Sequence, residues 1–125
     1  MKSSAKFLVE KTATGFTAYS EELGILAAGK TLKDVYQDAR DGLQDQAEYL
    51  NENPDDYELH FTYDVPAFFE ATRLNVAAVS EVSGMNATLI SQYVNGKKQP
   101  SRKQKDRLEE AVRQYAQGLN NFHFA

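Results

Sequence analysis

The 125-residue chain has no cysteine and no tryptophan, and its only histidines are His60 and His123. Without cysteine it can form no disulfide, no thiol nucleophile and no cysteine-based zinc site. We therefore expect neither a metal nor a cofactor. The longest apolar runs have four residues, at 25–28 and 76–79. A membrane helix needs about 20, and the N-terminus has no signal-peptide core, so we expect a cytoplasmic protein without membrane contact.

Charge is distributed unevenly along the chain, although the net charge is only −4. Residues 1–63 hold 6 Lys and Arg against 12 Asp and Glu, which gives −6, whereas residues 64–125 hold 8 against 6, which gives +2. An acid-free basic stretch favours binding of a polyanion, whereas an acidic region suits a basic partner. No acidic residue occurs between Glu81 and Asp106. The basic residues of that stretch are Lys97, Lys98, Arg102, Lys103 and Lys105.

The N-terminal part of the sequence predicts three strands. Residues 6–12 and 16–20 are rich in strand formers and flank a short turn that contains Gly15. This pattern favours a β-hairpin. The apolar run at residues 25–28 lies between two glycines and predicts a third, short strand.

A single helix and a fourth strand complete the first half. Thr31 is a good N-cap, and apolar residues recur at helical spacing over residues 32–50. Residues 51–56, with the sequence NENPDD, break this helix. Residues 57–63, YELHFTY, alternate strictly between apolar and polar side chains, which predicts a half-buried strand.

The period becomes helical from residue 64 onward, so we expect a domain boundary there. The predicted fold class is α+β, with a ββ(β)αβ domain over residues 1–63 and an all-α domain over residues 64–125. Helices are expected over residues 66–72, 76–83, 87–94 and 102–122, the last three with the N-caps Asn75, Asn86 and Ser101.

The second and third of these helices have the pattern of a helix-turn-helix. Val79, Met85 and Ile90 are apolar where two crossing helices would pack, and Gly84 suits a tight turn between them. The chain then carries no charged residue until Lys97. An uncharged helix rich in Asn, Gln, Ser and Thr beside basic residues is suited to reading base edges between phosphates.

The segment VAAVSEVSGMNATLISQYVNGKKQPS, residues 76–101, resembles the Cro/repressor (XRE-like) helix-turn-helix family. The resemblance extends over about residues 66–119, and NGKKQPS is its most specific part. It implies that the helix over residues 87–94 enters the major groove of double-stranded operator DNA. The base-reading positions would be Ala87, Thr88 and Gln92. The phosphate-binding residues would be Asn86, Asn95, Lys97, Lys98, Ser101 and Arg102.

The first half resembles the HicB antitoxin family over roughly residues 5–63. The residues that carry this resemblance are the hairpin with Gly15 and Phe16, and then GKTL at residues 29–32 before a helix with Ala39 and Leu43. It implies a degraded RNase H-like domain that binds a small basic, HicA-like toxin. Together the two resemblances imply an antitoxin-like repressor of its own operon, which is not an enzyme.

The last helix carries an apolar stripe over residues 102–122, which we interpret as the surface of a homodimer or a higher even oligomer. The sheet edge is the second choice for this contact. Two helix-turn-helix copies would span DNA half-sites about 10 base pairs apart. The residues assigned to the dimer interface are Leu108, Val112, Tyr115 and Leu119.

Two other functions remain open from the sequence. The chain could be a stand-alone dimeric regulator whose N-terminal domain senses a small molecule or only dimerises. It could also be a vestigial nuclease, because RNase H chemistry needs carboxylates that converge on two metal ions. Glu10, Asp34 and Asp38 are the nearest candidates for such a site, but surface charge explains them better.

Overall fold

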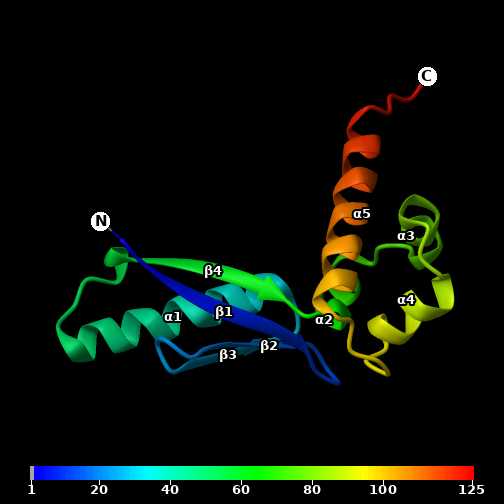
Figure 1. Ribbon diagram of the computed structural model, residues 1–125. Coiled ribbons are helices and arrows are strands. Elements are labelled where there is room, and N and C mark those ends of the chain that lie inside the picture. Colours follow the sequence, from blue (N-terminus) through cyan, green and yellow to red (C-terminus); the bar gives the residue numbers. More distant parts are fainter. Residues whose placement is uncertain (1) are drawn as a thin grey trace. The chain divides into compact units, whose positions relative to one another are not determined.

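The computed structural model describes residues 2–125, which fold into two compact units (Figure 1). The first unit ends at Ala71, and the second comprises Thr72–Ala125. The division thus lies at the last residue of helix α2 (Val65–Thr72), whereas the change of period at residue 64 predicts a boundary before this helix. The reason is that Ala67 of α2 is buried in the core of the first unit.

The first unit contains a four-stranded mixed sheet in the order β3-β2-β1-β4. Its strands are β1 (Ser3–Lys11), β2 (Phe16–Ser20), β3 (Ile25–Gly29) and β4 (Tyr57–Tyr63). The first three form an antiparallel meander, and β4 pairs in parallel with β1. The sheet together with the helices confirms the α+β class. The extents of β2 and β4 agree with the sequence prediction, whereas β1 begins three residues earlier.

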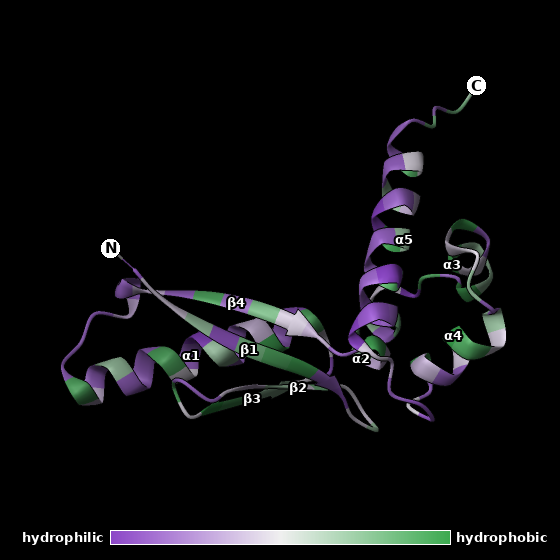
Figure 2. Ribbon diagram, in the orientation of Figure 1, coloured by the Kyte–Doolittle hydropathy of each residue, from purple (hydrophilic) through white to green (hydrophobic). Residues whose placement is uncertain are grey.

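Helix α1 (Leu32–Leu50) covers one face of this sheet (Figures 1 and 2). It begins where predicted, because the Thr31 side chain accepts a hydrogen bond from the N–H of Asp34. It ends at Asn51, which adopts a left-handed conformation. A short 3₁₀ turn, η1 (Pro54–Asp56), leads into β4. The buried residues that α1 shares with the strands are Phe7, Val9, Phe16, Ala18, Ile25, Ala27, Val35, Ala39 and Leu43.

The second unit consists of helices α3 (Val76–Ser83), α4 (Ala87–Val94) and α5 (Arg102–Asn120). The predicted N-caps of all three are confirmed. Asn75, Asn86 and Ser101 each accept a backbone N–H with the side chain. These caps satisfy amide groups that a helix cannot satisfy internally. The buried apolar residues of the unit are Val79, Met85, Ile90, Tyr93, Leu108 and Ala111.

Candidate nucleic-acid interface

The two compact units carry opposite charge. The first, through residue 71, has 6 Lys and Arg against 14 Asp and Glu, for a net charge of −8. The second, from residue 72, has 8 against 4, for +4. The charge contrast is therefore larger between the folded units than between the two sequence halves. A nucleic acid would be attracted to the second unit and repelled by the first.

The connection between α3 and α4 is held by hydrogen bonds within its own segment. Gly84 has φ +71°, and its N–H donates to the carbonyl of Ser80 at 2.9 Å. The Ser80 hydroxyl donates to the carbonyl of Met85 at 2.5 Å, and the Met85 N–H donates to the Ser83 hydroxyl at 3.0 Å. A Cβ on Gly84 would meet nothing within 4 Å, so the positive φ, and not close packing, requires glycine here.

Helix α4 has a buried side and an uncharged polar side. Ile90 and Tyr93 are buried within the unit, which fixes the rotation of the helix about its axis. Two of the predicted base-reading residues, Ala87 and Thr88, are exposed in the first turn, and Gln92 is partly exposed one turn later. Thr88 and Gln92, four residues apart, lie on the same side of α4, whereas Ala87 precedes the buried Ile90 by three residues and so lies nearer the buried side.

The predicted phosphate-binding residues lie at the two ends of α4 and at the start of α5. Asn86 accepts the N–H of Leu89 with its side-chain oxygen, so the NH₂ of its side chain takes no part in the cap. After α4 the chain turns at Gly96, with φ +76°. The N–H groups of Lys97 and Lys98 then donate to the carbonyl of Gln92, at 2.9 and 3.2 Å. These bonds fix the backbone of both lysines, and their side chains are exposed. Asn95, Ser101 and Arg102 are also exposed.

The first turn of α5 carries an unfavourable arrangement of charge. It contains Arg102, Lys103 and Lys105 and no acidic residue. Cations at a helix N-terminus oppose the helix dipole, by about 0.3–1 kcal/mol each at exposed positions. A bound anion would reverse that effect, because it favours both the positive helix end and the basic side chains.

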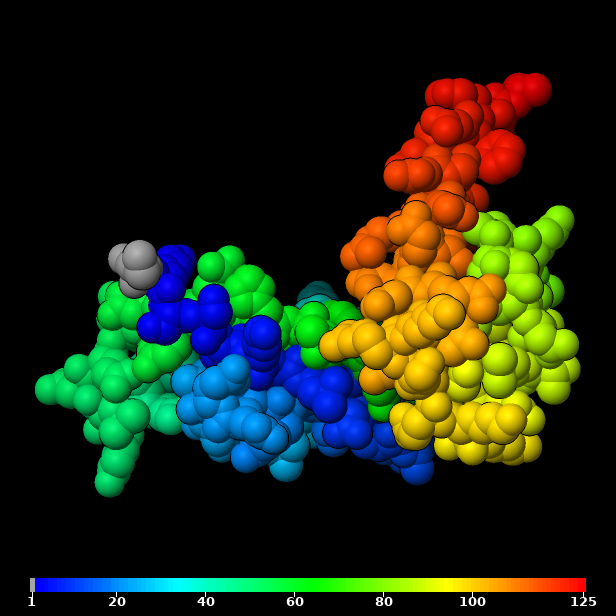
Figure 3. Space-filling model, in the orientation of Figure 1, coloured from blue at the N-terminus to red at the C-terminus, as the bar shows by residue number. Residues whose placement is uncertain are grey.

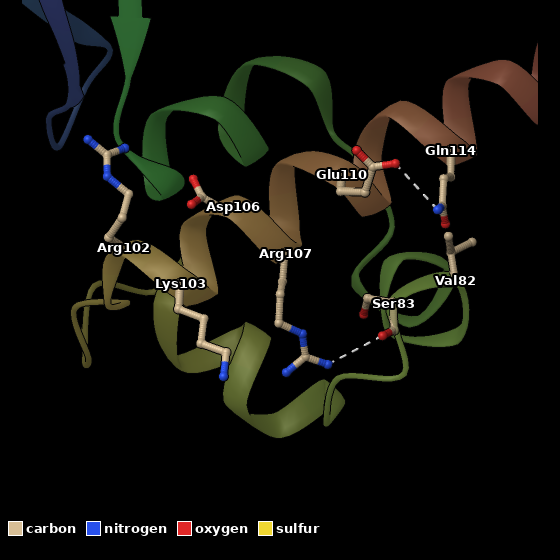
Figure 4. Close-up of a pocket in the computed structure, with 8 residues that line it drawn as sticks. All are labelled: Val82, Ser83, Arg102, Lys103, Asp106, Arg107, Glu110 and Gln114. Atoms are coloured by element: carbon tan, nitrogen blue, oxygen red, sulfur yellow. Dashed lines mark hydrogen bonds between the residues drawn. The ribbon is translucent and has the colours of Figure 1, made fainter.

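Helix α5 and the end of α3 border an open groove (Figure 4). The Arg107 guanidinium projects from α5 and donates to the carbonyl of Ser83 at 3.4 Å. This contact places a cation at the C-terminal end of α3, where the helix dipole favours it. Arg107 was not predicted from the sequence, because no local pattern separates it from its basic neighbours. The groove is lined by Val82, Ser83, Arg102, Lys103, Asp106, Arg107, Glu110 and Gln114.

The residues assigned to a dimer interface differ in exposure. Leu108 is 4% exposed and packs inside the unit, so it offers little surface to a second chain. Val112 and Tyr115 are partly exposed, whereas Leu119 is 53% exposed. Within the second unit, the C-terminal part of α5 extends beyond α3 and α4 (Figure 3). Of the four residues, Leu119 therefore offers the most exposed side chain to a partner.

The carboxylates considered for nuclease chemistry lie on two different faces of the first unit. Glu10 is on the sheet face that α1 does not cover, whereas Asp34 and Asp38 are on α1. Asp38 accepts the N–H of Ala28 from strand β3 at 2.9 Å. Among residues 2–125, no group of three or more His, Asp or Glu side chains is positioned to hold a metal ion.

Comparison with known proteins gives no further guide to this surface. The chain matches no protein-family profile, no curated protein and no solved structure. No helix within residues 2–125 is long and apolar enough to cross a membrane. The function must therefore be inferred from the arrangement of the residues themselves.

Proposed function

We propose that this chain is an antitoxin-like transcriptional repressor that binds operator DNA through its second unit. The observation that carries the proposal is the exposed side of α4. It is polar and uncharged, and it is followed by exposed basic residues whose backbone is held by hydrogen bonds. Uncharged polar groups next to cations are suited to contact base edges between phosphates.

In this proposal α3, the connection at residues 84–86 and α4 form a helix-turn-helix of the Cro/repressor type. Helix α4 lies in the major groove, where Gln92 pairs with an adenine edge and Thr88 meets a base or a thymine methyl. Asn86, Lys97 and Arg102 contact phosphates on either side of the groove. Two caps and the Arg107 contact support the arrangement, because the caps fix the starts of α4 and α5 and Arg107 joins α5 to the end of α3.

A homodimer would allow two copies of α4 to reach half-sites about 10 base pairs apart. Residues 112, 115 and 119 of α5 and residue 122 just after it follow the alternating spacing of three and four that is typical of a coiled-coil seam, whereas Leu108 packs within the unit. Figure 2 shows α5 as mostly hydrophilic, with a few hydrophobic positions along its length. Leu119, which is 53% exposed, and Phe122, which is 75% exposed, form the accessible end of this apolar seam. Val112 and Tyr115 would lie at the edge of the proposed dimer contact.

The first unit is proposed to be a degraded RNase H-like domain that binds a small basic protein, as the resemblance to HicB antitoxins implies. Its net charge of −8 favours association with a cationic partner. It would also keep DNA away from this part of the chain.

Fluorescence anisotropy with the purified full chain tests the proposal. The labelled probe is the DNA immediately upstream of the coding sequence, and a shuffled duplex of equal length is the control. We expect binding at least 10³-fold tighter to the upstream DNA at physiological salt, as for specific DNA binding proteins. Equal affinity for both duplexes would contradict operator recognition. No binding to either duplex would contradict the assignment of a DNA-binding unit.

A further inference from the structure

A row of apolar side chains crosses the sheet face that α1 leaves uncovered. Leu8 of β1 pairs with Tyr19 of β2, and Tyr19 pairs with Leu26 of β3. Their side chains are 45%, 46% and 68% exposed. Because strands in a sheet lie about 4.8 Å apart, the row is continuous across three strands.

The side-chain alternation of the strands places this row on the uncovered face. Val9, Ala18 and Ala27 are buried between the sheet and α1, and their neighbours along the strands point to the opposite face. A solvated face of an antiparallel sheet is ordinarily polar. Clustered exposed apolar residues, particularly with a tyrosine among them, are typical of a protein-binding surface.

The charges around the row indicate what kind of partner it fits. Glu10 follows Leu8 on the same face of β1. Lys6 lies on the other side of Leu8, and its backbone N–H donates to the Glu22 carboxylate. With a net charge of −8 on the unit, face-to-face packing of two copies would bring strongly like charges together. A basic partner would instead be attracted.

We propose that this uncovered face, centred on Leu8, Tyr19 and Leu26, is the docking surface for a small basic protein. The partner presents an apolar patch to the row and a lysine or arginine side chain to Glu10. This inference rests on the proposed function of the first unit as a protein-binding domain and specifies where on that unit the partner binds.

The test is calorimetric titration of the full chain with a catalytically inactive, basic HicA-like toxin. The row variants are Tyr19→Ala and Leu26→Lys, and the matched controls are Tyr49→Ala and Leu50→Lys, which change similar exposed residues at the end of α1. We expect each row variant to weaken toxin binding by about tenfold or more. The controls should bind like the wild type. Thermal unfolding of all four variants checks that the fold is retained.

Two results would overturn the docking surface while leaving the proposed function intact. One is toxin binding by the row variants with wild-type affinity, and the other is equal weakening in the controls. If the wild type binds its operator DNA but not the toxin, the docking surface and the toxin partner both fail, and DNA binding stands. If the row variants abolish a self-association seen in sedimentation of the wild type, the occupant is a second copy and the proposal is wrong.

Discussion

Helix α1 in the first unit has 19 residues, whereas α3 and α4 in the second have eight each. Four residues of α1 are buried, compared with Val79 alone in α3 and two residues in α4. An isolated helix shorter than about 12–15 residues is only marginally stable. Helices α3 and α4 therefore depend more strongly than α1 on side-chain caps and on local hydrogen bonds.

This difference has a functional consequence. In the first unit, the residues that stabilise the fold and those proposed to bind a partner lie on opposite faces of the sheet. In the second unit, Asn86 caps α4 and also stands beside the proposed DNA surface. Stability and binding are thus separable by mutation in the first unit and overlap in the second.

The largest effect is expected from Phe7→Ala, because Phe7 is fully buried in the core of the first unit. We expect the free energy of unfolding of that unit to fall by about 3–5 kcal/mol. Urea denaturation followed by circular dichroism measures it. The matched change Leu8→Ala, on the exposed face of the same strand, should cost far less. A similar loss in both variants would contradict the division of the sheet into a core face and a binding face.

Gln92→Ala should weaken binding to operator DNA by about 1–3 kcal/mol and relax the preference at one base pair. The reason is the loss of a proposed bidentate contact to a base edge. Anisotropy titrations with operators changed at single positions measure both effects. Gln117→Ala, an exposed change on α5, is the control. Unchanged operator affinity of Gln92→Ala would disprove its assignment as a base-reading residue.

Asn86 offers a way to separate capping from DNA binding. Asn86→Ala should reduce the stability of the second unit by about 0.5–2 kcal/mol, because the N–H of Leu89 loses its acceptor. Asn86→Asp should keep that stability, since a carboxylate also caps a helix and favours its dipole. Its negative charge should nevertheless weaken DNA binding. If the Asn86→Asp variant binds the operator with wild-type affinity, Asn86 does not lie beside a phosphate.

Lys97→Ala should weaken binding to all DNA sequences alike and reduce the slope of log affinity against log salt by about one. The cause is the loss of one cation that releases a counterion from the DNA. Lys33→Ala, which removes an exposed lysine from α1, should leave the slope unchanged. Identical slopes for wild type and Lys97→Ala would show that Lys97 makes no phosphate contact.

The smallest effect concerns Asp64, at the start of α2. Burial raises the pKa of Asp64, although the N–H it accepts from Ala67 lowers it in part. Because the folded state binds this proton more tightly, the contribution of Asp64 to stability falls as pH rises through its folded pKa. Asp64→Asn keeps a side-chain oxygen for Ala67 and removes the charge. At neutral pH the Asp64→Asn variant should be slightly more stable than the wild type, whereas at low pH it should have no such advantage. Thermal unfolding of both proteins across this pH range measures the difference.

Local signals in the sequence predicted most of the elements. The N-caps Thr31, Asn75, Asn86 and Ser101 fixed helix starts because each acts within three residues of itself. The strict alternation of residues 57–63 likewise predicted β4. The assignment of α4 to base reading and the two family resemblances stay predictions.

Features that depend on distant residues were not predictable in the same way. Helix α2 joins the first unit because Ala67 meets a core assembled from strands far away in sequence. The apolar row emerges only from the register of three strands, since Leu8, Tyr19 and Leu26 each look unremarkable in their own segment. The contact of Arg107 with Ser83 spans 24 residues. None of these has a local sequence signal.

The hydrogen bond from the N–H of Ala28 to Asp38 also affects how chains can associate. Strand β3 lies at one edge of the sheet, where backbone groups can add a strand from another molecule. Asp38 occupies one donor on this strand and places a negative charge beside it. Edge-to-edge aggregation through β3 is thereby disfavoured, and β4 is left as the edge more open to strand addition.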